Sequence, residues 1–224
     1  MAAASLLAGG PSPAKVVPLG IVTHAERAHV GEAAVSAGST VFDGDQLSTG
    51  AGGALRITGP SLRLQLDAQS ILTLRRPADA EDGMEADLAS GTLVFSVARN
   101  GSIKVVANEA SIQPAADVAT VAHIRVVNPK ELRIYAQRGA LEFSYHGESE
   151  VIPEGAAYRV LLDPSDKELT AFSDSEEARQ KARKPHTKFL LLAIATAAGV
   201  AVPVLTRNFE SPDSPGPTSV SKMP

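Results

Sequence analysis

Apolar and polar residues alternate through much of this chain. Residues 62–66 read LRLQL, with an apolar side chain at every second position. This period sends alternate side chains to opposite faces of a β-strand, so one face packs in a core and the other meets water. The sequence therefore predicts an all-β domain over residues 16–163, a sandwich or roll-like stack of short strands. Similar short runs, separated by Gly, Asp, Asn and Pro, lie at residues 71–74, 93–97, 103–107, 121–127, 132–136, 140–145 and 158–162.

Helical periodicity is weak in the same region. Residues 81–89 are the best candidate for a helix, and they are few. Aromatic residues make up 4% of the chain and Trp is absent, so the core must be built from Val, Ile, Leu and Ala. The absence of cysteine excludes disulfides, thiolate metal ligands and cysteine nucleophiles.

Two segments share the pattern Gly-x-Leu-x-Phe-Ser. Residues 91–96 read GTLVFS and residues 139–144 read GALEFS. Each follows a polar turn and opens a predicted strand. The recurrence favours two similar β units stacked in one domain, and chance repetition of a turn-then-strand signal is the alternative.

The segments that flank this domain differ from it in composition. Residues 1–15 are mostly small and apolar, and we interpret them as a flexible N-terminus or the remnant of a signal peptide. Residues 164–188 are charged and contain prolines, which is typical of a linker. Residues 207–224 are rich in Ser and Pro and are predicted to be a disordered tail.

An uncharged apolar segment of 17 residues extends from Phe189 to Leu205. As a helix that rises about 1.5 Å per residue it would be about 25 Å long, slightly less than the hydrocarbon core of a bilayer. The segment is apolar on all sides, whereas a helix packed on a soluble core keeps a polar face. Residues 189–206 are therefore predicted to form one transmembrane helix, and a buried core helix or strand is the alternative.

A glycine-rich motif lies before the LRLQL segment. Residues 41–54 read VFDGDQLSTGAGGA, and a GD-x-L-x-T-G-x-G-G run of this kind is a hallmark of the FecR domain family, which this chain resembles over residues 20–163. The resemblance covers about two-thirds of the chain. Its supporting segments are residues 20–22, 30–37, 62–66, 70–74, 88–93, 138–141 and 152–155.

The resemblance implies an extracytoplasmic β domain that works by protein contact. Founding members of the family are membrane-spanning regulators that sense a signal through partner proteins and control a sigma factor. In those regulators a cytoplasmic segment and a membrane helix precede the β domain, whereas here the apolar segment follows it. We therefore expect a membrane-anchored interaction or signalling module without catalytic activity, and not the sigma-factor role. The alternative is an envelope domain that binds glycan or peptidoglycan.

The motif residues are best explained by turn chemistry. Asp-Gly-Asp favours a tight turn because Gly tolerates positive φ and Asp side chains bond nearby backbone, and the later glycines permit a bulge or a close approach of strands. Asp43 and Asp45 are a weaker Ca²⁺ candidate, because the other oxygen ligands of a known loop are missing. The residues assigned to this structural turn are Asp43, Gly44, Asp45, Thr49, Gly50, Gly52 and Gly53.

Other chemistry finds little support. His24 and His29 are five positions apart, which on a strand sends them to opposite faces, so they are not expected to share a metal. No P-loop, dinucleotide or hydrolase motif is present, and no cofactor is expected. The net charge of −4 argues against a nucleic-acid partner. The aromatic residues available to hold a sugar are Phe42, Tyr135, Phe143, Tyr145 and Tyr158.

Two signals disagree about the side of the membrane on which the β domain lies. The basic cluster between Arg179 and Lys188 precedes the apolar segment, and the positive-inside rule then keeps the domain in the cytoplasm. The resemblance and the signal-like residues 1–15 instead imply export. We expect the exported arrangement, with the basic cluster against anionic headgroups.

Overall fold

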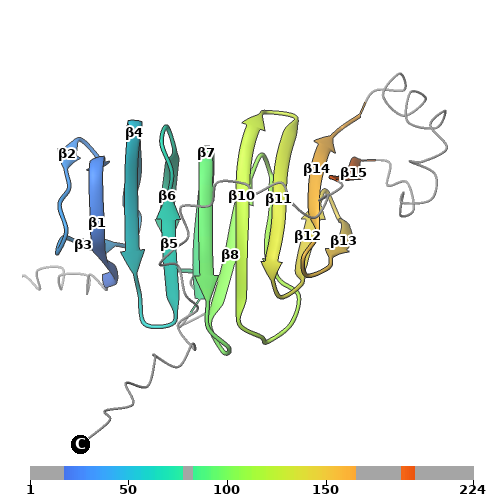
Figure 1. The fold of residues 1–224 in the computed structure, drawn as a ribbon, viewed down its shortest axis with the longest axis horizontal. Coiled ribbons are helices and arrows are strands. Elements are labelled where there is room, and N and C mark those ends of the chain that lie inside the picture. Colours follow the sequence, from blue (N-terminus) through green and yellow to red (C-terminus); the bar gives the residue numbers. More distant parts are fainter. Residues whose placement is uncertain (1–17, 78–82, 165–187, 195–224) are drawn as a thin grey trace, which may run out of the picture.

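The computed structural model describes residues 18–77, 83–164 and 188–194. These residues form 15 β-strands and contain no helix (Figure 1), so the predicted all-β class is confirmed for the described residues. The predicted N-terminal segment, most of the charged linker and the Ser/Pro-rich tail lie outside the described residues. The strands are β1 (Pro18–Val30), β2 (Ala33–Ala34), β3 (Thr40–Phe42), β4 (Gln46–Thr58), β5 (Leu62–Leu66), β6 (Ile71–Arg75), β7 (Gly83–Val97), β8 (Ser102–Ala107), β9 (Ala110–Pro114), β10 (Thr120–Asn128), β11 (Glu131–Arg138), β12 (Leu141–Tyr145), β13 (Glu148–Ile152), β14 (Ala157–Leu162) and β15 (Phe189–Ala193).

The strands form two layers that share β7. Strands β6 and β8 pair with residues 83–90 of β7, whereas β5 and β10 pair within residues 91–97. From β7 the first layer continues through β10, β11 and β14 to β15, and the second continues through β8, β9 and β12 to β13. The two ends of this path meet, because the ring centroids of Phe143 on β12 and Phe189 on β15 lie 4.9 Å apart. The sheet therefore folds over at β7 into a sandwich, with β5 in the first layer and β6 in the second.

Two glycines lie where the chain passes between layers. Gly91, at φ +86°, joins the two halves of β7, and Gly139, at φ +72°, joins β11 to β12. A Cβ on Gly91 would lie 2.4 Å from the Cα of Ser70, and one on Gly139 would lie 2.7 Å from Oγ1 of Thr120. Both positions therefore require glycine. These are the glycines of the repeated Gly-x-Leu-x-Phe-Ser pattern. At both occurrences the chain passes between layers at the glycine, and the Leu and Phe that follow are buried.

The short helix proposed for residues 81–89 is wrong for the described part of that segment, which lies in β7. Met84, Ala86 and Leu88 are buried while Glu85 and Asp87 are partly exposed. This is a period of two, as in a strand: β6 and β8 pair with its edges, and one of its faces packs in the core. The rest of the core follows the composition, because Leu, Val, Ile and Ala make up most of its buried side chains.

The last strand, β15, occupies residues where the sequence predicts a membrane helix. It pairs antiparallel with β14, from Leu162 opposite Phe189 to Tyr158 opposite Ala193. In this structure residues 189–193 are a strand and not a helix, since the edge of β14 offers backbone partners and the interior beside Phe143 accepts the Phe189 ring. Residues 195–206 of the predicted helix lie outside the described residues. Within the part of the chain that the structure describes, no helix is long and apolar enough to cross a membrane.

Candidate interaction surface

Three arginines occupy directly opposed positions on three neighbouring strands of the first layer. Arg125 on β10 lies in register with Arg133 on β11, and Arg133 lies in register with Arg159 on β14. Side chains at such positions point to the same side of the sheet, with Cβ atoms about 5 Å apart. All three are exposed, and the row continues to Leu192 on β15.

Two further arginines extend the same surface. Arg56 on β4 lies opposite Gln65 on β5, and Arg63 lies opposite Ser96 on β7. Their neighbours in sequence point into the core, so both arginines point outward from the first layer. Five arginines thus point outward from the first layer of a chain whose net charge is −4. We call this surface the arginine face; its arginines are Arg56, Arg63, Arg125, Arg133 and Arg159.

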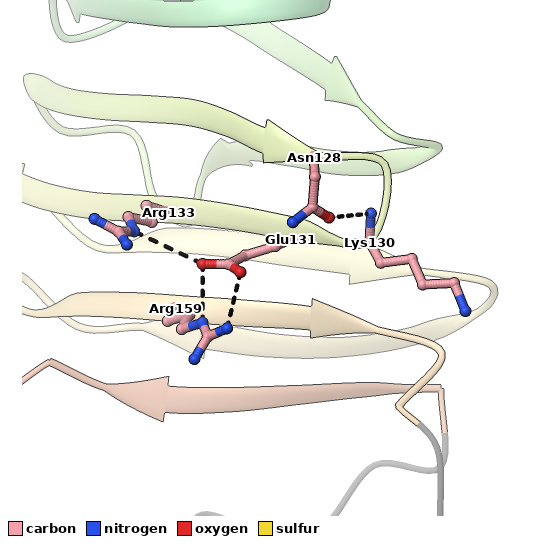
Figure 2. Close-up of polar contacts among 5 residues, drawn as sticks. All are labelled: Asn128, Lys130, Glu131, Arg133 and Arg159. Atoms are coloured by element: carbon pink, nitrogen blue, oxygen red, sulfur yellow. Dashed lines mark hydrogen bonds and ion pairs between the residues drawn. The ribbon is translucent and has the colours of Figure 1, made fainter. Parts of the chain in front are cut away.

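Glu131 organises one end of the row (Figure 2). Its carboxylate accepts hydrogen bonds from both Nε and a terminal nitrogen of Arg159, at 2.8 and 2.9 Å, and its Oε1 lies 3.8 Å from Nε of Arg133. The Glu131 side chain is 9% exposed. This bidentate pair fixes the planar Arg159 guanidinium over β11 and β14. At the nearby turn, Oδ1 of Asn128 accepts the Lys130 N–H at 2.9 Å.

Like charges at opposed positions of a sheet destabilise it. Glu131 offsets this cost for Arg133 and Arg159, but Arg125 has no ion-pair partner within the described residues. The second layer shows the opposite arrangement, because Arg75, Glu85 and Lys104 follow one another in register with alternating sign. The Lys104 and Glu85 side chains there form a 3.3 Å ion pair. A row of three arginines with one described acid, and none described for Arg125, therefore distinguishes the first layer and suits a negatively charged ligand.

The predicted Asp-Gly-Asp turn connects β3 to β4. Gly44 has a φ of +84°, and its N–H donates to the Leu74 carbonyl at 2.8 Å. Oδ2 of Asp45 accepts the Phe42 N–H, and Oδ1 of Asp43 accepts the Arg76 N–H, both at 2.8 Å. The two carboxylates therefore bond backbone. No group of three or more potential metal ligands occurs among the described residues.

The other motif residues lie on β4. Gly52 has a φ of +67°, and a Cβ on Gly53 would lie 2.9 Å from the Glu26 carbonyl oxygen on β1. Gly50 has neither constraint, since a Cβ there would meet only ordinary contacts of 3.6 Å or more. Thr49 is buried, and its hydroxyl donates to the Asp67 carbonyl and accepts the Ser70 N–H. The motif thus joins β1, β4 and the β5–β6 turn, and it lies apart from the arginine row in the strand order.

The aromatic residues do not gather into a sugar-binding platform. Phe143 and Tyr145 are buried in the core, and Tyr158 is partly buried against it. Tyr135 contacts the His123 ring on the arginine face, and Phe42 is exposed on β3. A shallow groove of about 690 Å³ lies at the turns before β8, β10, β12 and β14, and it contains both arginine and glutamate side chains.

Comparison with known proteins gives little further information. No family model matches the chain, and no curated protein matches it. Two crystal structures of a proposed anti-sigma factor from Parabacteroides distasonis ATCC 8503 are similar in structure, with TM-scores of 0.44 and 0.43 at 12% and 14% identity. Each similarity covers 52% of this chain and 54% of the other, so the matched part is about half the length of those proteins. The arginine face is therefore the feature of this chain that points to a function.

Sequence reasoning missed the arginine face. Each of its arginines is a charged residue between apolar neighbours, so the sequence indicates that each points to solvent. It does not indicate that β10, β11 and β14 are neighbours, because the chain leaves the first layer for β12 and β13 before it returns. The usable signal was the choice of arginine at solvent positions in three predicted strands.

Proposed function

We propose that this chain is a non-catalytic interaction module that acts by protein contact and takes an acidic protein segment on its arginine face. The row of Arg125, Arg133 and Arg159 carries the proposal. Guanidinium groups bind carboxylates with defined geometry. Among the described residues no acid offsets the repulsion between Arg125 and Arg133, and a carboxylate from a partner would do so. The resemblance to FecR domains supports action through a partner protein. The glycan alternative is not favoured, because its aromatic candidates lie mainly in the core.

Site-specific photo-crosslinking of the full chain in its host cell tests this function. The photoreactive residue replaces Tyr135, on the arginine face, or Thr73, which lies opposite Asp87 on the outer side of the second layer. Each label is combined with the double charge reversal R125E/R133E. The matched control is R75E/K104E, which reverses two charges on the second layer. Crosslinked segments are identified by mass spectrometry.

The proposal predicts an adduct at Tyr135 with an acidic protein segment. It should be lost in R125E/R133E, retained in R75E/K104E, and weakened as salt is raised during the reaction, because screening reduces exposed charge pairs. Equal adducts at Thr73, or an adduct that survives R125E/R133E, would contradict it. An adduct to residues 165–187 of the same chain would also contradict it, because the face would then be occupied from within.

We further propose membrane attachment through the segment from Phe189 to Leu205, with the β domain on the extracytoplasmic side. The uncharged segment and the family resemblance support this proposal. Protease treatment of intact spheroplasts tests it. Digestion of the β domain from outside is the expected result, and full protection of that domain would rule out export.

A further inference from the structure

Phe189 and its neighbours close one end of the sandwich. The Phe189 ring is fully buried and meets Phe143 of the second layer edge-on, at an interplanar angle of 68°. Backbone hydrogen bonds extend the pairing at both ends of β15, from Asp163 N–H to the Lys188 carbonyl and from Ile194 N–H to the Ala157 carbonyl, each at 2.8 Å. Residues 188–194 are therefore an integral part of the described fold.

Lys188 adds a link to the second layer. Its ammonium group donates to the His146 carbonyl in the β12–β13 turn, and its N–H donates to Oε2 of Glu148 at 3.3 Å. When β15 is paired with β14, the chain is thus held to both layers immediately before the apolar segment.

The same residues are needed by a membrane span. A transmembrane helix requires about 20 apolar residues, and rarely fewer than about 17, to cross a hydrocarbon core about 30 Å thick. The apolar segment has 17 residues, of which β15 and Ile194 hold the first six. The 11 that remain, residues 195–205, would extend only about 17 Å as a helix. A lone strand is no substitute, because its backbone groups would be unpaired in lipid.

We infer that β15 is a detachable strand and that its pairing with β14 and a membrane span of residues 189–205 exclude each other. The inference rests on the membrane attachment proposed above. The chain then has two forms: a closed form with Phe189 in the sandwich, and an inserted form in which residues 189–193 have left the sheet. In the inserted form the edge of β14 loses its partner strand, and the core beside Phe143 loses the Phe189 ring.

A disulfide between β14 and β15 would hold the chain in the closed form and prevent the inserted form. The chain has no cysteine, so an engineered pair is the only possible disulfide. Leu161 and Leu190 occupy directly opposed register positions on β14 and β15, where antiparallel Cα atoms lie about 4.5–5.5 Å apart, within the range a disulfide spans. The variant is L161C/L190C in the full chain. The matched control is S144C/S149C, an opposed pair on β12 and β13 that leaves β15 free.

Each variant is oxidised or reduced and mixed with phosphatidylcholine–phosphatidylglycerol vesicles. Insertion is scored as the protein that stays with the vesicles after alkaline carbonate extraction. We expect insertion of reduced L161C/L190C and of S144C/S149C in both redox states, and loss of insertion for oxidised L161C/L190C. Equal insertion of oxidised and reduced L161C/L190C would overturn the exclusion. Failure of every preparation to insert would overturn it too, because the segment would then serve only as a strand.

Hydrogen exchange gives a second measurement on the unmodified chain. The Asp163 N–H is bonded to Lys188 only in the closed form. Its protection should be lost on insertion into vesicles, while the Leu93 amide, in the central β7 strand that pairs on both sides, stays protected. Retained protection at Asp163 in the inserted protein would contradict the inference. Neither experiment involves the arginine row, so their failure would leave the proposed protein contact unaffected. Loss of insertion in every preparation would contradict the membrane attachment itself, whereas insertion of the oxidised L161C/L190C chain would contradict only the exclusion.

Discussion

The hydroxyl of Tyr145 donates a 2.7 Å hydrogen bond to Oδ2 of Asp163. Tyr145 lies on β12 in the second layer and Asp163 follows β14 in the first, so the bond joins the layers at the end where β15 is paired. Burial, followed by the bond to Asp163 and its negative charge, raises the pKa of Tyr145 to about 12. Deprotonation would place two negative charges in contact and remove the donor.

The raised pKa predicts a loss of stability at high pH. The unfolded chain releases the Tyr145 proton near pH 10.0 and the folded chain near pH 12. The contribution of this group is therefore complete below pH 10 and is lost as the pH rises through 12. The Y145F variant should be less stable than the unmodified chain near neutral pH and should approach it above pH 12. Thermal unfolding of both chains across this range measures the difference, and a constant difference would contradict the prediction.

Replacement of Gly91 tests the crossing between layers. G91A combines a left-handed backbone with a Cβ that would lie 2.4 Å from the Ser70 Cα, and we expect it to lower the free energy of unfolding by about 2–5 kcal/mol. G44A is the control, because Gly44 has a similar φ of +84° but a Cβ added there would meet no atom within 4 Å. It should cost only the backbone strain, about 1–2 kcal/mol. Equal costs in denaturant titrations would mean that the close approach at Gly91 is not limiting.

Removal of the Glu131 charge tests the support of the arginine row. E131Q weakens the bidentate pair between the buried Glu131 carboxylate and the half-exposed Arg159 guanidinium, and it should destabilise the domain by about 1–2 kcal/mol because water partly screens this pair. E142Q is the control on the second layer, where Oε2 of Glu142 accepts a hydrogen bond from the neutral Gln113 amide. It should change stability by less than about 1 kcal/mol. Chemical unfolding compares the two, and an E131Q chain as stable as E142Q would show that the row does not depend on this carboxylate.

Truncation of Phe189 tests whether β15 belongs to the domain. F189A removes a fully buried ring and should lower stability by about 3–5 kcal/mol. L192A, a partly exposed position of the same strand, should cost about 1 kcal/mol or less. Unfolding is measured in lipid-free buffer with the full chain. An unaffected F189A chain would mean that residues 189–193 do not pack on the sandwich in solution.

The strands could be predicted from the sequence wherever one face of the strand is buried and the other is exposed. Residues 62–66 alternate in the printed sequence and form β5 with the same bounds. The repeated Gly-x-Leu-x-Phe-Ser pattern was readable, but it was interpreted as a turn followed by a new strand, whereas Gly91 lies within β7. Its role at a crossing between layers depends on positive φ and close packing, which the sequence does not show. The register of β10, β11 and β14 was not readable, since neighbouring strands are chosen by contacts between distant segments. The arginine face depends on that register, and so it escaped prediction.

The sequence by itself determined the period-two strands, the turns between them and an uncharged segment that begins at Phe189. It did not determine how that segment is used, because an apolar segment can bond its backbone within itself as a helix in lipid, or bond one side of its backbone to a sheet edge as a strand. Only the tertiary structure determined that residues 189–193 form a strand, because it brings the edge of β14 and the ring of Phe143 together at one end of the sandwich. Pairing with that edge satisfies the backbone groups of β15 that face β14, and the same packing buries Phe189.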